Sequence, residues 1–134
     1  MMIQWTEDLA TDVREIDAQH QELFARVNDL LAASSQGAGT KEISRVIKFL
    51  EDYVKTHFST EESYMVRHAY RDYQGHKAQH AEFIRDFNAL KDLLEKEGSS
   101  SYLVIKTNRA VCDWLTNHIK KVDKAMGAYL KTRL

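Results

Sequence analysis

Helical periodicity is the feature that most limits how this chain can fold. In four segments, apolar residues and some histidines recur at alternating spacings of three and four, which places their side chains along one face of an α-helix. The chain contains no proline, so no proline interrupts these segments. We therefore predict an all-α fold. The four sets, in chain order, are Ile16, His20, Leu23, Val27 and Leu31; Ile43, Val46 or Ile47, Leu50, Val54, His57 and Glu61; His76, His80, Phe83, Phe87, Leu90 and Leu94; and Val104, Thr107, Val111, Leu115, His118 and Val122.

Three breaks separate the predicted helices. Residues 34–40 read Ser-Ser-Gln-Gly-Ala-Gly-Thr and predict a flexible turn, with Thr40 as the N-cap of the second helix. Gly98 and the three serines after it are expected to end the third helix and cap the fourth. The break between the second and third helices is expected within residues 67–72, which contain neither glycine nor proline.

Short connections favour antiparallel neighbours, so these breaks predict an up-down-up-down four-helix bundle. The first residues of the chain carry Trp5, Leu9 and Val13 without clean periodicity, and we expect them to form an N-terminal arm across the bundle. A short helical tail is expected at the C-terminus. The length of 134 residues matches the usual size of one domain, so residues 1–134 are expected to form a single domain.

The charge balance and hydropathy limit the location and the partners of the protein. Lys and Arg number 19 against 20 Asp and Glu, for a net charge of -1, so the basic excess that attracts nucleic acid or anionic membranes is lacking. Apolar runs are short and the N-terminus lacks the features of a signal peptide, so we expect no membrane insertion and a cytoplasmic location. The single cysteine, Cys112, cannot form an internal disulfide, in agreement with a reducing compartment.

Histidines lie on the predicted buried face of every helix. His57 and Glu61 are four residues apart, as are His76 and His80. On an α-helix this spacing brings the two Cβ atoms within about 5–6 Å on one face, which suits a shared metal. Polar groups that are buried together need partners. The pattern would bury the carboxylate of Glu61 together with five imidazoles, those of His20, His57, His76, His80 and His118.

Asp123 supplies a second acid to this set. It lies five residues after His118, an interval that a straight α-helix does not align, so we expect the backbone to loosen or end between them. An isolated histidine on an apolar face is more often a satisfied core residue, and Glu61 alone would be a surface residue. Here five histidines on four helices coincide with two acids, which favours a metal site. We interpret His68, which lies off the buried face, as a surface residue without a role.

The number and type of candidate ligands indicate which metal centre would suit them. Seven ligands are too many for one tetrahedral zinc ion, and two carboxylates can each bridge a pair of ions, so a dinuclear centre uses the set economically. Oxygen-activating di-iron bundles of the ferritin-like type carry Glu-x-x-His motifs and more carboxylates, and this chain has no such motif. Five neutral imidazoles with two acids stabilise high-valent iron poorly. Reversible oxygen binding therefore fits the set better than oxidation of a substrate.

Four segments resemble the ligand motifs of hemerythrins, in the same order and over nearly the whole chain. The chain length also resembles that of bacterial hemerythrins and myohemerythrin. The resemblance implies reversible dioxygen binding at a non-heme di-iron centre, for storage, delivery or sensing, in a protein that is not an enzyme. The segments are Ile16-Asp17-Ala18-Gln19-His20, His57-Phe58-Ser59-Thr60-Glu61-Glu62, His76-Lys77-Ala78-Gln79-His80 and Trp114-Leu115-Thr116-Asn117-His118-Ile119-Lys120-Lys121-Val122-Asp123.

The same resemblance implies a role for each candidate residue. One iron would be held by His76, His80 and His118, and the other by His20 and His57. Both irons would be bridged by an oxo or hydroxo group and by the carboxylates of Glu61 and Asp123. The second iron would be one ligand short, and dioxygen would bind there. The implied oxygen pocket, for which ordinary core packing is the alternative interpretation, consists of Leu23, Phe58, Trp114, Leu115 and Ile119.

Two other functions stay open for such a site. One is a di-iron stress protein or enzyme that handles peroxide or nitric oxide, or that donates iron. Against it, no further acid, tyrosine or cysteine is recognisably placed as a relay, and Cys112, next to Val111, is expected to be a small buried thiol. The other is a structural or signalling domain in which the metal only stabilises the fold. A sensor of this kind would need a separate partner protein.

Overall fold

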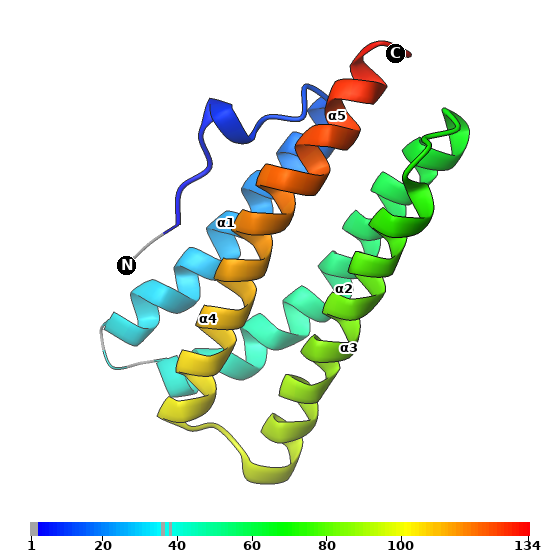
Figure 1. The fold of residues 1–134 in the computed structure, drawn as a ribbon. Helices are drawn as coiled ribbons and strands as arrows, with labels where there is room; N and C mark the ends of the chain where they lie inside the picture. Colours follow the sequence, from blue (N-terminus) through cyan, green and yellow to red (C-terminus); the bar gives the residue numbers. More distant parts are fainter. Residues whose placement is uncertain (1–2, 36, 38) are drawn as a thin grey trace.

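The computed structural model describes residues 3–35, 37 and 39–134, and the described residues form helices and no strands. Four long helices run up and down alternately (Figure 1), which confirms the predicted antiparallel bundle. A short 3₁₀ turn, η1 (Glu7–Leu9), precedes them, and a π-helical turn, η2 (Ile119–Asp123), joins the fourth helix to α5 (Lys124–Lys131), the predicted C-terminal tail. The four long helices are α1 (Arg14–Ser35), α2 (Gly39–Arg67), α3 (Tyr73–Glu97) and α4 (Ser101–His118).

Two of the three predicted breaks are confirmed. Gly98 adopts φ +73°, a conformation that favours glycine, and its N–H donates to the Leu94 carbonyl at the end of α3. The side chain of Ser100 accepts a hydrogen bond from the Leu103 N–H and caps α4. Residues 68–72 connect α2 to α3, within the predicted interval. The hydroxyl of Tyr129 on α5 donates a hydrogen bond to the His68 carbonyl at 2.6 Å and so fixes this turn against α5.

The turn between α1 and α2 differs from the prediction in its details. The helix α1 continues through Ser35, so the turn is shorter than residues 34–40. The prediction that Thr40 caps α2 is wrong, because α2 already begins at Gly39 and Thr40 lies in its first turn. The boundary shifted because threonine is compatible with a first helical turn as well as with a cap. Residues 36 and 38 of the predicted turn lie outside the described residues.

Most residues of the predicted helical faces form the core, which is divided into two apolar regions. Leu31, Leu94 and Val122, at the ends of those faces, are only half-buried. The larger region extends from the middle of the bundle toward the α3–α4 turn and contains Leu23, Leu50, Phe83 and Leu115 among its buried residues. The smaller region lies at the opposite end, around Val13, Ile16, Met65, Met126 and Leu130. The histidines of the predicted buried faces lie near the boundary between these two regions on each helix. The metal-ligand candidates are therefore enclosed by apolar side chains on both sides.

The N-terminal residues form the predicted arm (Figure 1). Leu9 and Val13 are buried, and Asn28 of α1 pairs with both the N–H and the carbonyl of Ile3, at 3.0 and 2.7 Å. The arm lies so close to α5 that a Cβ added to Gly127 would come within 2.4 Å of the Thr11 carbonyl oxygen. No helix in the described part of the chain is both long and apolar enough to cross a membrane.

Candidate metal centre

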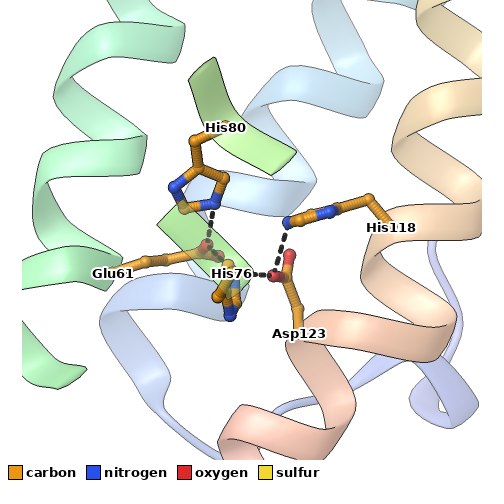
Figure 2. Close-up of side chains that lie close together, drawn as sticks. All are labelled: Glu61, His76, His80, His118 and Asp123. Atoms are coloured by element: carbon orange, nitrogen blue, oxygen red, sulfur yellow. Dashed lines mark hydrogen bonds and ion pairs between the residues drawn. The ribbon is translucent and has the colours of Figure 1, made fainter. Parts of the chain in front are cut away.

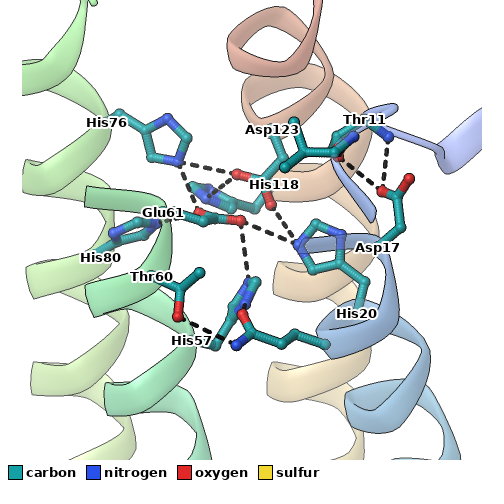
Figure 3. Close-up of polar contacts among 12 residues, drawn as sticks. Thr11, Asp17, His20, His57, Thr60, Glu61, His76, His80, His118 and Asp123 are labelled. Atoms are coloured by element: carbon teal, nitrogen blue, oxygen red, sulfur yellow. Dashed lines mark hydrogen bonds and ion pairs between the residues drawn. The ribbon is translucent and has the colours of Figure 1, made fainter. Parts of the chain in front are cut away.

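Seven buried side chains converge in the middle of the bundle (Figure 3). Every long helix contributes at least one of them, and the π-turn contributes one more. None is more than 4% exposed, so each has lost nearly all contact with bulk water. The seven are the candidates identified from the sequence: His20 on α1, His57 and Glu61 on α2, His76 and His80 on α3, His118 on α4, and Asp123 on η2.

The seven side chains form two overlapping groups, each with ligand atoms within 4.8 Å of one another. Two members, Glu61 and Asp123, belong to both groups. One group adds three histidines, His76, His80 and His118, and the other adds two, His20 and His57. Two ligand groups that share both carboxylates could hold two cations side by side.

Each carboxylate directs one oxygen toward each group. Oε1 of Glu61 lies 3.2 and 3.0 Å from Nε2 of His76 and His80 (Figure 2), whereas Oε2 lies 3.1 Å from Nε2 of both His20 and His57. The two oxygens of Asp123 are divided between the groups in the same way. Its Oδ1 lies 2.9 and 3.0 Å from Nε2 of His76 and His118, and its Oδ2 lies 3.0 Å from Nε2 of His20. Both acids therefore have the placement of bridging ligands.

The π-turn explains how Asp123 reaches the cluster. Five residues along a regular α-helix correspond to a rotation of about 140° beyond one full turn, which would point Asp123 away from His118. In η2 the Lys124 N–H instead donates to the carbonyl of Ile119, five residues earlier, and the extra residue turns the aspartate back inward. This confirms the predicted loosening of the backbone.

Hydrogen bonds do not satisfy all the buried polar atoms of the cluster. Nε2 of His118 and both oxygens of Asp123 are buried without a hydrogen-bond partner among the described residues, although imidazole nitrogens lie about 3 Å from the carboxylate. Buried polar atoms without partners are costly, and a buried cation would satisfy these. A set of imidazole nitrogens and carboxylate oxygens also suits first-row transition metals. The residues present therefore fit a metal centre.

Contacts within the cluster shift the pKa of several of its members. Burial lowers the pKa of His20 and His76, but contacts with the two carboxylates outweigh burial and raise each pKa to about 9. Burial raises the pKa of Glu61 and of Asp123, and the surrounding imidazoles outweigh it and hold both well below their usual range. Burial lowers the pKa of His118. A metal that enters the cluster must displace protons from His20 and His76.

Comparison with known proteins gives a consistent result. Residues 11–130 match the family described as the Hemerythrin HHE cation binding domain. The chain is 37% identical over 131 residues to the bacteriohemerythrin of Methylococcus capsulatus, an alignment that spans 96% of this chain and 97% of that protein. The chain belongs to the hemerythrin family.

Further similarities extend over the whole fold of this hemerythrin-family chain. It is 32% identical over 119 residues to a hemerythrin-like protein of Naegleria gruberi, covering 89% of this chain and 86% of that one. The crystal structure of a wild-type hemerythrin superposes with a TM-score of 0.85 at 34% identity, covering 97% of this chain and 98% of the other.

Three residues that the sequence analysis did not assign contact the outer nitrogens of the hemerythrin histidines. Nδ1 of His57 lies 2.7 Å from the amide oxygen of Gln19, and Nδ1 of His118 lies 3.0 Å from that of Gln79. Nδ1 of His80 lies 2.9 Å from a carboxylate oxygen of Glu62. A signal was present in the sequence, because both glutamines precede a histidine in an Ala-Gln-His triplet and Glu62 follows Glu61. Each, however, holds a histidine on the next helix.

The five predicted pocket residues of the hemerythrin fold belong to the larger apolar region of the core or pack against it. Two of them stack on histidines: the Phe58 ring lies 3.8 Å from the His80 ring with planes 4° apart, and the Trp114 ring lies 4.1 Å from the His118 ring with planes 13° apart. Trp114 is only partly buried. The three aliphatic members are at most 3% exposed and belong to the larger core region: Leu23, Leu115 and Ile119.

His68 lies outside the hemerythrin ligand cluster, but its predicted exposure is only partly right. The residue is half-buried, in the turn that follows α2. The turn packs against α5, where the Tyr129 hydroxyl bonds to the His68 carbonyl, and this contact covers part of the residue. Its position in a turn, rather than on a helical face, made the burial difficult to predict.

Proposed function

We propose that this chain binds dioxygen reversibly at a non-heme di-iron centre, and that residues 1–134 act as one hemerythrin-like domain. The observation that carries the proposal is the pair of overlapping ligand groups, which share Glu61 and Asp123 but contain three histidines in one group and two in the other. The family supports iron as the metal and dioxygen as the ligand.

In this proposal the side chains divide into terminal and bridging ligands. Three histidines, His76, His80 and His118, would complete the shell of one iron. His20 and His57 would leave the other iron one ligand short, at a position where dioxygen can enter. Glu61 and Asp123 would bridge the two irons together with an oxo or hydroxo group. When bound, the iron pair supplies one electron per ion and an open coordination position.

The protein around the cluster would limit side reactions. Leu23, Leu115 and Ile119 are almost completely buried in the apolar core, and in this proposal they would form an apolar wall on one side of the cluster. An apolar wall keeps water and anions from the metals and removes the proton donors that promote loss of a reduced ligand. The stacked rings of Phe58 and Trp114 hold His80 and His118 in a fixed orientation. The chain thus supplies ligands, orientation and a dry environment.

The decisive experiment is to load the protein with ferrous iron under anaerobic conditions, add oxygen and then remove it, while the visible charge-transfer absorption is followed. Reversible binding predicts a spectrum that appears and disappears over several cycles, with two irons per chain by metal analysis. A reproducible value of one iron per chain would contradict the dinuclear centre. One-way oxidation would contradict oxygen carriage and favour the alternative, a stress protein or enzyme that handles peroxide, nitric oxide or iron donation.

A further inference from the structure

The cluster has an approximate internal twofold relation that exchanges Glu61 and Asp123. His20 contacts the Oε2 and Oδ2 oxygens of these acids at 3.1 and 3.0 Å, and His76 contacts the Oε1 and Oδ1 oxygens at 3.2 and 2.9 Å. The ring pairs correspond as well. His20 and His57 lie 4.6 Å apart at 71°, and His76 and His118 lie 5.0 Å apart at 77°.

The outer nitrogens follow the same relation. His57 and His118 each pair with a glutamine amide, from Gln19 and Gln79. The Nδ1 atoms of His20 and His76 are both buried without a hydrogen-bond partner among the described residues. Four of the five histidines therefore form two matched pairs, in their inner contacts and in their outer contacts.

His80 and its partner Glu62 have no counterpart in this relation. Nε2 of His80 lies 3.0 Å from Oε1 of Glu61, and within the described chain no sixth imidazole takes the matching position beside Oδ2 of Asp123. The outer partner is also exceptional. Glu62 is a carboxylate, whereas the other outer partners are neutral amides, and its side chain is only 24% exposed. In the sequence, Lys124 follows Asp123 where Glu62 follows Glu61.

We infer that Glu62 is a positioning residue that makes the two metal positions electrostatically different. This inference rests on the proposed di-iron centre. A carboxylate that accepts a hydrogen bond from the outer nitrogen of a ligating histidine fixes the ring and makes its inner nitrogen a stronger donor. The metal held by His76, His80 and His118 thus receives additional negative charge, which stabilises its higher oxidation state.

The first test is a Co²⁺ titration of the metal-free full-length chain, followed by visible absorption. The wild-type chain is expected to bind two Co²⁺ ions. Glu62→Gln keeps an oxygen acceptor but removes the charge, and it should weaken one of the two sites by about 10- to 100-fold while leaving the other unchanged. The matched control is Glu82→Gln, the same substitution at an exposed position on α3, which should leave both sites unchanged.

The second test measures the midpoint potential of the iron-loaded protein and separates charge from hydrogen bonding. Glu62→Gln should raise the potential, because removal of negative charge favours the reduced metal. Gln79→Glu adds a carboxylate beside His118 on the same metal and should lower it. A role limited to holding the ring would be disrupted by Glu62→Ala and would leave Glu62→Gln equal to wild type.

The outcomes distinguish the inference from the proposed function. A wild-type chain that binds one Co²⁺ would contradict the dinuclear centre itself. Two wild-type sites that are both unaffected by Glu62→Gln, or potentials that do not move in opposite directions in Glu62→Gln and Gln79→Glu, would overturn the role of Glu62 and leave the dinuclear centre standing.

Discussion

The helices α2 and α4 perform the same task with different backbones. On α2, His57 and Glu61 are four residues apart, and a regular helix brings both to the cluster. His118 ends α4 and Asp123 follows five residues later, where the π-turn η2 is needed to aim the aspartate. The π-turn also has packing support, since it lies against η1 of the N-terminal arm. A regular helix thus aims its acid by its own periodicity, whereas the acid on the irregular turn depends on a π-turn that lies against a neighbouring segment.

The largest expected effect comes from removal of the bridging acid on the regular helix. Glu61→Ala should abolish stable binding of two metals, because it removes a ligand from both groups and leaves excess positive charge among the buried imidazoles. A loss of about 3–5 kcal/mol in the stability of the loaded protein is expected. Metal analysis and thermal unfolding measure both effects. His68→Ala is the control, and full iron with equal melting temperatures in the two variants would refute the assignment.

Two aliphatic residues test whether the α4 side of the cluster has a special role. Leu115 and Val54 lie three residues before His118 and His57, and both are buried. Leu115→Ala should cost about 2–5 kcal/mol in stability, keep both irons and speed oxidation to the diferric state, because water and anions enter the cavity. Val54→Ala should destabilise the protein without changing the oxidation rate. The oxidation rate is measured by absorption at a temperature well below the unfolding transition. An unchanged rate in Leu115→Ala would disprove the pocket.

Gly127→Ala tests whether the N-terminal arm supports the π-turn η2, which carries Asp123. The new Cβ would lie 2.4 Å from the Thr11 carbonyl oxygen, so the backbone of the arm must move away from α5. We expect a loss of about 1–3 kcal/mol and weaker metal retention. Gly75→Ala is the matched control, because the three atoms nearest its Cβ all belong to the side chain of Asp72 and not to backbone. Chelator competition measures retention, and equal retention in the two variants would show that the arm does not support Asp123.

A last prediction concerns the pH dependence of the metal-free protein. The pKa of His20 and of His76 rises on folding from 6.5 to about 9, so their contribution to stability is complete below pH 6.5 and is lost as the pH rises through about 9. The melting temperature of the metal-free chain should therefore fall over this interval. The loaded protein should not show this fall, since its imidazoles are already deprotonated. A metal-free melting temperature that is constant or rises would contradict the proton-filled cluster.

The sequence by itself determined the helical class, the burial pattern and the seven candidate ligands. Spacings of three and four define a helical face wherever they occur, and a histidine such as His20 or His76 on that face must be buried when the face is. The need for an irregular backbone before Asp123 also followed from the sequence, because an interval of five does not fit an α-helix. Properties that depend on a single helix were therefore predictable.

Contacts between helices were decided only by the tertiary structure. Gln19 and Gln79 each precede a histidine in the sequence but hold one on another helix, and Glu62 pairs with His80 of α3. The partial burial of His68 depends in the same way on Tyr129 of α5. Periodicity specifies which face of a helix is buried, but it does not specify the height and rotation at which neighbouring helices meet. Those two quantities follow from the packing of side chains across the whole core.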